Sequence, residues 1–143
     1  MSRPHTVTSK IAPVLGSGPV FFAAGAYNAA DRSTMLLIPS AEPRSQAAGT
    51  GWGIAKTAIV KRKTLKQPLL LRGRRLDGQG DLGFSGTGHR PFAALQLWPK
   101  FGGALGKFKW KGLAAWAVDA GCYGLQIDGR TFSEVIVFRV AFR

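Results

Sequence analysis

The chain has 143 residues, the size of one ordinary domain, and 45% of them are hydrophobic, enough for a single core. Twenty Lys and Arg against seven Asp and Glu give a formal net charge of +13, which attracts polyanions, anionic lipid headgroups and acidic glycans. One cysteine, Cys122, excludes an intrachain disulfide and a zinc site of several cysteines, and no apolar run is long enough for a transmembrane helix.

Glycine and proline interrupt the chain too often for long helices, and the apolar runs between them are short and rich in Val, Ile, Leu and Phe. We expect residues 1–12 to form a flexible basic arm and residues 13–143 to form one all-β domain. Strands are predicted after the turn that begins at 16, and then over 33–40, 54–60, 68–76, 82–84, 92–98, 121–129 and 131–142. The GKFKWKG segment (106–112) and residues 114–118 are predicted to supply one or two more.

Turn signals support this order. Asp77-Gly78 and Asp128-Gly129 are typical of tight hairpins, 42–51 has the composition of a loop, and 61–67 is predicted to be a basic turn. The strand over 131–142 is apolar on both faces in its middle, which places it at the centre of a sheet or under cover on both sides. Seven to nine short antiparallel strands favour a β-sandwich over a barrel.

The segment Asp119-Ala120-Gly121-Cys122-Tyr123 matches the D-x-G-x-Y pattern of immunoglobulin-like domains. In those domains the tyrosine hydroxyl bonds to upstream backbone and forms a tyrosine corner. We therefore expect an immunoglobulin-like sandwich in which Asp119, Gly121 and Tyr123 are structural. Leu125 stands where disulfide-bonded members carry a cysteine, so packing must replace the bridge between the sheets.

Several segments together resemble a group of uncharacterised bacterial proteins, most of them exported. These segments are GSGPV (16–20), GWGIAKT (51–57), LLLRGRRLDGQGDLGF (69–84) and GCYGLQIDGRTFSEVIVFRV (121–140). The last of them matches a carboxy-terminal GCYxxQxDGxxFSxxIVF strand pair. The resemblance implies an immunoglobulin-like fold and an extracytoplasmic or secreted location, with a cytoplasmic location as the alternative because no export signal precedes the domain. It implies no activity.

Residues suited to catalysis are few. His5 lies in the arm and His89 in a glycine-rich loop, and neither has a carboxylate close in sequence. Asp77, Asp81 and Asp128 lie in or beside turns, where Asp favours tight backbone geometry. We therefore predict no enzyme activity, catalytic residue, metal site or cofactor. A hydrolase would require folding to bring His89 and two carboxylates into one pocket.

A basic run without acids extends from residue 56 to 75, and the segment GKFKWKG (106–112) alternates lysine with aromatic residues. Such cations can serve solubility alone. The functional interpretation is a non-enzymatic binding or structural module of the cell envelope or exterior, whose basic face meets polysaccharide or anionic lipid headgroups. The alternative is an intracellular binder of single-stranded nucleic acid, which requires Phe108, Trp110 or Trp116 exposed beside lysines. The predicted polyanion site is Lys61, Arg62, Lys63, Arg72, Arg74, Arg75, Lys107, Lys109 and Lys111.

Overall fold

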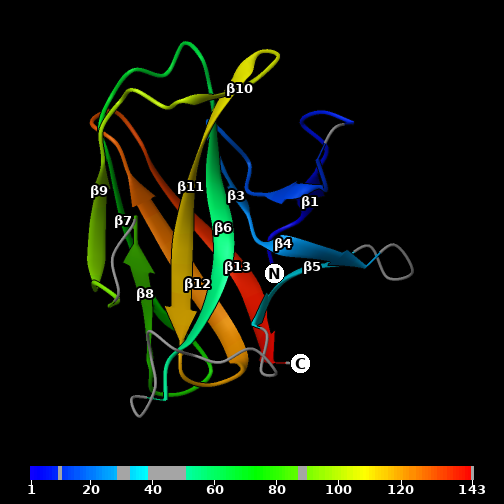
Figure 1. Ribbon diagram of the computed structural model, residues 1–143, viewed down its shortest axis with the longest axis vertical. Coiled ribbons are helices and arrows are strands. Elements are labelled where there is room, and N and C mark those ends of the chain that lie inside the picture. The colour runs from blue at the N-terminus through cyan, green and yellow to red at the C-terminus, as the bar shows by residue number, and fades with distance from the viewer. Residues whose placement is uncertain (10, 29–32, 39–50, 87–89, 143) are drawn as a thin grey trace.

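The computed structural model describes residues 1–9, 11–28, 33–38, 51–86 and 90–142, and within these ranges the chain is all-β (Figure 1). No helix in these ranges is long and apolar enough to cross a membrane. The strands are β1 (Pro4–His5), β2 (Val14–Leu15), β3 (Val20–Ala23), β4 (Gly25–Asn28), β5 (Ser33–Ile38), β6 (Gly53–Arg62), β7 (Leu69–Arg75), β8 (Asp81–Ser85), β9 (Ala94–Leu97), β10 (Gly103–Leu105), β11 (Phe108–Ala117), β12 (Gly121–Asp128) and β13 (Ser133–Phe142).

These strands form one mixed sheet in the order β1-β2-β3-β6-β11-β8-β7-β12-β13-β5-β4, with β10 beside β11 and β9 beside β7. The pairs are antiparallel except β13 with β5, which is parallel. Strand β8 joins the two halves of the sheet, because its last residues pair with β11 and its first residues pair with β7. The all-β prediction is confirmed, but the sheet is a strongly curled open half-barrel and not clearly the predicted antiparallel sandwich.

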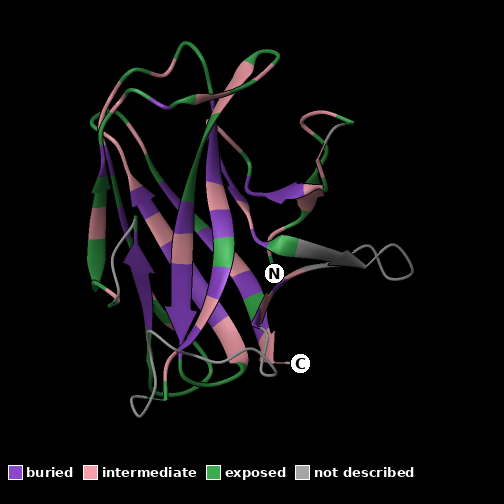
Figure 2. Ribbon diagram, viewed as in Figure 1, coloured by how far each residue is buried: buried purple, intermediate pink, exposed green. Residues whose placement is uncertain are grey.

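The curl brings distant strands face to face around one core. Phe22 on β3 and Phe138 on β13 lie on opposite halves of the sheet, and their ring centroids are 5.0 Å apart. Along most of β6 and β13, buried positions alternate with more exposed ones (Figure 2). This alternation follows from the two-residue period of a strand, and the buried positions share the concave face.

Strand β13 is central, as expected, because β12 and β5 flank it. Its inner residues Ile136, Phe138 and Val140 have no exposed surface, but Val135 on the outer face is 60% exposed. Cover on both faces would require a second layer over β12 and β13, but the buried cluster that contains these three residues lies on the inner side of the strand. Val135 therefore contributes β-propensity to the strand and little burial, whereas Val137 is half-buried.

The first twelve residues, expected to be a flexible basic arm, take part in the sheet. Strand β1 pairs with β2, and the Ser2 N–H donates a 2.8 Å bond to the Val137 carbonyl of β13. The Val137 N–H donates in turn to Ser2 Oγ, also at 2.8 Å. Val7 and Ile11 pack on a small second cluster on the outer face of β3 and β6, made of Val14, Phe21 and Val60. Residues at the start of the chain thus connect one end of the sheet to β13.

Other strands lie close to their predicted positions. Strand β6 extends two residues further than expected, to Arg62, so the expected turn over 61–67 begins later in the chain. The GKFKWKG segment and residues 114–117 form one strand, β11, and not two. Strands β1, β2, β4 and β10 were not predicted. The expected loop over 42–51 lies outside the described residues except at Gly51.

Candidate functional site

Five lysines line one cavity at the end of the half-barrel that is uppermost in Figure 1. The cavity is open to solvent and has a volume of about 330 Å³. Leu65, Pro99 and Phe101 supply its apolar wall. We call it the lysine pocket, and its cations are Lys61 on β6, Lys63 and Lys66 in the turn after β6, Lys100 between β9 and β10, and Lys109 on β11.

Lys61 forms the buried part of the lysine pocket and is only 2% exposed. It follows Ala55, Thr57 and Ile59 on the inner face of β6, because every second residue of a strand faces the same side. Its ammonium group donates a hydrogen bond to the Pro99 carbonyl and lies 4.2 Å from the centroid of the Phe101 ring. Burial lowers the pKa of Lys61, because removing water disfavours the charged amine.

No acidic residue in the described ranges lines the lysine pocket. Lys61 and Lys109 stand directly opposite each other on neighbouring antiparallel strands, an arrangement in which like charges repel. The other three lysines are exposed, and none of the three has a salt bridge within the described ranges. The pocket therefore holds positive charge that the described part of the chain leaves without a counter-ion.

The β10–β11 hairpin adds cations at the same end. Lys107 is exposed at its turn, and its carbonyl accepts a 3.0 Å hydrogen bond from the Lys63 N–H. Arg62, on the outer face of β6, is exposed, and its guanidinium carbon lies 5.8 Å from the Phe108 ring centroid. Lys111 is exposed further along β11.

The aromatic residues of the GKFKWKG segment lie on the other face of β11. Phe108 is half-buried against Phe21, with ring centroids 6.2 Å apart in an edge-to-face arrangement. Trp110 lies over Gly103 so closely that a Cβ at Gly103 would be 2.2 Å from the indole ring, and 40% of Trp110 remains exposed. Trp116 is buried and donates to Ser85 Oγ at 2.9 Å. Trp116 and part of Phe108 are therefore covered, whereas Trp110 keeps exposed surface on the face of β11 opposite to Lys109.

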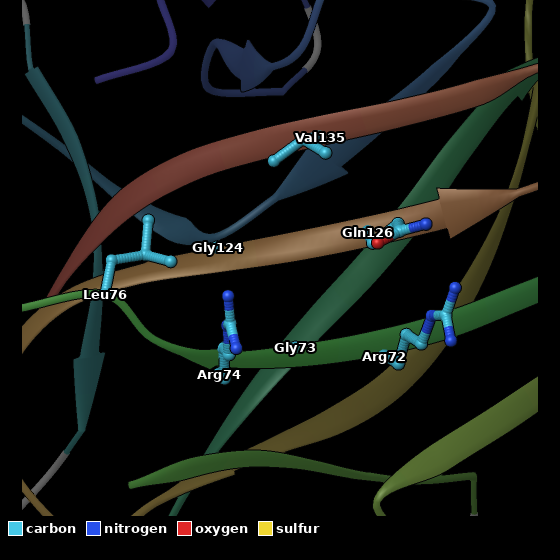
Figure 3. A pocket seen from close by; sticks show the side chains of 7 residues that line it. All are labelled: Arg72, Gly73, Arg74, Leu76, Gly124, Gln126 and Val135. Atoms are coloured by element: carbon cyan, nitrogen blue, oxygen red, sulfur yellow. The ribbon is translucent and has the colours of Figure 1, made fainter. Parts of the chain in front are cut away.

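Two predicted arginines lie elsewhere, on the outer face of the other half of the sheet. Arg72 and Arg74 project from β7 beside Gln126 of β12 and Val135 of β13 (Figure 3). The hollow between them has an open volume of about 450 Å³. Arg72 pairs with Asp128 at 3.2 Å, whereas Arg74 is exposed and has no ion pair with any residue that the structure describes. This face therefore carries less uncompensated charge than the lysine pocket.

Arg75 belongs to the tyrosine corner. The Tyr123 side chain is 1% exposed, and its hydroxyl donates a 2.8 Å bond to the Asp119 carbonyl, as predicted. Arg75 Nε lies 2.8 Å from Asp77 Oδ1, and Arg75 Nη1 lies 3.9 Å from Asp119 Oδ2. A Cβ on Gly121 would come within 2.6 Å of Arg75 Nε, so this position needs glycine. Arg75 thus links the turn after β7 to the start of β12.

The nine cations of the predicted site are therefore divided between different surfaces. The prediction that Lys61 belongs to the basic turn over 61–67 is wrong, because β6 continues through it, and its ammonium group lies over the Phe101 ring. The prediction also missed Lys66 and Lys100, which line the pocket with Lys61, Lys63 and Lys109. Lys66 stands in the basic run and could have been included, but the sequence gives no sign that Lys100 folds beside it.

Among the residues that the structure describes, no cluster of three His, Cys, Asp or Glu could hold a metal ion. His5 is exposed on β1, with its ring centroid 5.8 Å from that of Phe21. His89, required by the hydrolase alternative, lies outside the described residues. Glu134 is buried on the inner face of β13, where its Oε2 accepts a 2.9 Å bond from the Ser17 N–H and burial raises its pKa.

No family model, no curated protein and no solved structure matches this chain.

Proposed function

We propose that this protein is a non-enzymatic binding module that attaches to acidic polymers or anionic surfaces through the lysine pocket and the cations around it. The observation that carries the proposal is the convergence of five lysines on one cavity without a lining carboxylate. Lys107 and Arg62 extend the positive surface at the same end. Positive charge concentrated on one end of a small domain attracts polyanions with little selectivity for their sequence.

A salt titration of binding to a heparin-like polyanion tests the proposal. Affinity should fall steeply as salt is added, because each neutralised anionic group releases condensed counter-ions. The variant Lys66→Glu with Lys100→Glu should bind more weakly, and the slope of log affinity against log salt should decrease by about two, one for each lost contact.

The matched control is Lys56→Glu with Arg74→Glu, which changes the net charge equally at two exposed positions outside the lysine pocket. The control should retain most of the affinity, since separate surface charges are screened beyond about 10 Å at 0.1 M salt. Equal losses in the two double variants would show that net charge alone drives binding. A flat salt response in the wild type would contradict the proposal.

One observation favours single-stranded nucleic acid as a second candidate ligand. Trp98 is 68% exposed and stands immediately before Pro99 and Lys100 of the lysine pocket. An exposed indole beside cations can stack on a base while the lysines contact phosphates. Trp98→Ala should then weaken binding of a single-stranded oligonucleotide at least about fivefold, and leave heparin binding unchanged. Equal effects on both ligands would remove this candidate.

We also propose that the module acts outside the cytoplasm, as the resemblance of residues 121–140 to exported bacterial proteins implies. Its immunoglobulin-like character has support from the tyrosine corner at Tyr123. Cell fractionation with an antibody against the native protein tests the location. Recovery in the cytosolic fraction alone would contradict it.

A further inference from the structure

The lysine pocket has a property that a flat basic surface lacks, because one of its five cations is buried. Lys61 lies at the covered side of the cavity, and its hydrogen-bond acceptor is a carbonyl, which carries no negative charge. An ammonium group withdrawn from water without a counter-ion is unfavourable, and four further lysines around the same cavity add repulsion. A ligand that relieves this arrangement must be anionic, and a second negative charge increases the gain.

The type of cation sets the kind of contact that the ligand must accept. In the described ranges, Arg72 pairs with Asp128 and Arg75 pairs with Asp77. A guanidinium binds a carboxylate or a phosphate through two parallel hydrogen bonds, whereas a lysine ammonium acts as a compact point charge and needs no planar match. The described lining of the lysine pocket contains lysines and no arginine, so the pocket selects its ligand by the amount of negative charge.

The size of the pocket adds a further constraint. A volume of about 330 Å³ is at the lower end of the range for small-molecule sites, roughly 300–1,000 Å³. Phosphate alone would leave much of this volume empty, and Leu65 and Pro99 offer an apolar wall for a small organic group. A phosphodiester inside a polymer carries one negative charge and is flanked by chain on both sides. A phosphate monoester carries close to two charges at pH 7 and has a free end.

We propose that the lysine pocket binds a phosphate monoester carried on a small organic group, for which glucose 6-phosphate is the probe. Lys61 supplies positive charge at the covered side of the cavity, and the exposed Lys63, Lys66 and Lys100 donate to the phosphate oxygens. The proposal rests on the proposed function, since polymer binding and phosphate-ester binding use the same end of the molecule. It adds selectivity for a terminal phosphate over internal charges of a polymer.

Isothermal titration calorimetry with glucose 6-phosphate, glucose 6-sulfate and glucose tests the proposal on the full chain. The phosphate ester should bind more tightly than the sulfate ester at pH 7, and glucose should not bind. Affinity for the phosphate ester should fall as the pH is lowered through about 6, where the phosphate gains its second proton, while affinity for the sulfate ester stays constant. Among the residues that the structure describes, the lining of the pocket includes no histidine or carboxylate. Equal affinity for the two esters at pH 7, or the same pH profile, would overturn the proposal.

The variant Lys61→Met removes the buried ammonium and keeps an unbranched side chain of similar length. It should weaken glucose 6-phosphate binding at least about tenfold, as expected for the loss of one buried positive charge close to the phosphate. The control Lys56→Met removes one exposed charge outside the pocket and should change affinity by no more than about twofold. If Lys61→Met does not fold, Lys66→Ala with Lys100→Ala replaces it, because both side chains are exposed.

Parallel titrations separate this proposal from the proposed function. Salt-dependent heparin binding by the wild type tests the proposed function alone, whereas glucose 6-phosphate binding by Lys61→Met tests the phosphate proposal. Unchanged glucose 6-phosphate binding in this variant would overturn the phosphate proposal and leave polymer binding intact. An oligosaccharide with a terminal phosphate that binds more tightly than glucose 6-phosphate would identify a polymer end as the source of the phosphate, and equal affinity would identify a free sugar phosphate.

Discussion

Replacing Phe138 with alanine should lower the free energy of unfolding by about 3–5 kcal/mol. The ring has no exposed surface, and its centroid lies 5.0 Å from that of Phe22 on the facing half of the sheet. Truncation therefore removes buried apolar surface and leaves a cavity, and it also removes an aromatic pair worth about 0.5–1.5 kcal/mol. The loss is large compared with the roughly 5–15 kcal/mol that stabilises most domains.

Urea denaturation followed by circular dichroism measures this loss. With a slope of about 2 kcal/mol per M, a change of about 4 kcal/mol moves the midpoint by about 2 M. Val135→Ala is the matched control, because Val135 lies on the same strand but is 60% exposed, and its effect should stay within about 0.5 kcal/mol. Equal midpoints for Phe138→Ala and the wild type would show that the two halves of the sheet do not share a core.

Three further substitutions have defined outcomes. Tyr123→Phe loses the hydroxyl bond of the tyrosine corner and should cost about 1 kcal/mol in urea denaturation; an unchanged midpoint would show that this bond is not stabilising. Burial raises the pKa of Glu134 in the folded state, so the wild type loses stability as the pH rises and this carboxyl group loses its proton. Glu134→Gln does not titrate and should therefore gain stability relative to the wild type from pH 4 to pH 7. A stability difference that does not vary with pH would contradict this prediction. A Cβ at Gly103 would overlap the Trp110 ring, so Gly103→Ala should displace Trp110, shift tryptophan emission to longer wavelength and lower the free energy of unfolding by about 1–3 kcal/mol. Gly102→Ala is the control, because its Cβ meets no atom within 4 Å, and it should change neither the emission nor the stability.

The sequence predicted the features that depend on short-range periodicity. Alternation along the last strand placed Ile136 and Phe138 on one face, and both are buried. The D-x-G-x-Y pattern predicted the burial of Tyr123 and its bond to backbone, because this local motif carries its own geometry. Alternation also separated Lys109 from Phe108 and Trp110 across β11. These features need no knowledge of which strands pair.

The curl of the sheet could not be predicted in the same way. Strand β8 pairs with β11 on one half and with β7 on the other, and nothing in residues 81–85 specifies two partners. The parallel pairing of β13 with β5 joins segments that no turn signal connects. Strand pairing of this kind depends on the packing of the whole core.

The candidate site was only partly predictable for a related reason. Extending the alternation of β6 beyond Ile59 places Lys61 on the inner face, but the predicted turn at 61 interrupted that pattern. Lys100 reaches the site through the segment between β9 and β10, whose path depends on long-range contacts. The sequence therefore indicated a basic surface, and the structure was needed to show which lysines converge.

The pairing of β13 with early parts of the chain has a consequence for the order of folding. Ser2 and Val137 are 135 positions apart, and β5 gains its second neighbour only when β13 is available. Closing such long loops before the contacts form slows folding, so we expect this domain to fold in milliseconds to seconds and not in microseconds. During synthesis on the ribosome, the edge of β5 that will pair with β13 stays unpaired until β13 has been made, and the apolar Leu36 and Ile38 of β5 lie beside this edge. Association between nascent chains is favoured in that interval, and it ends when β13 pairs with β5.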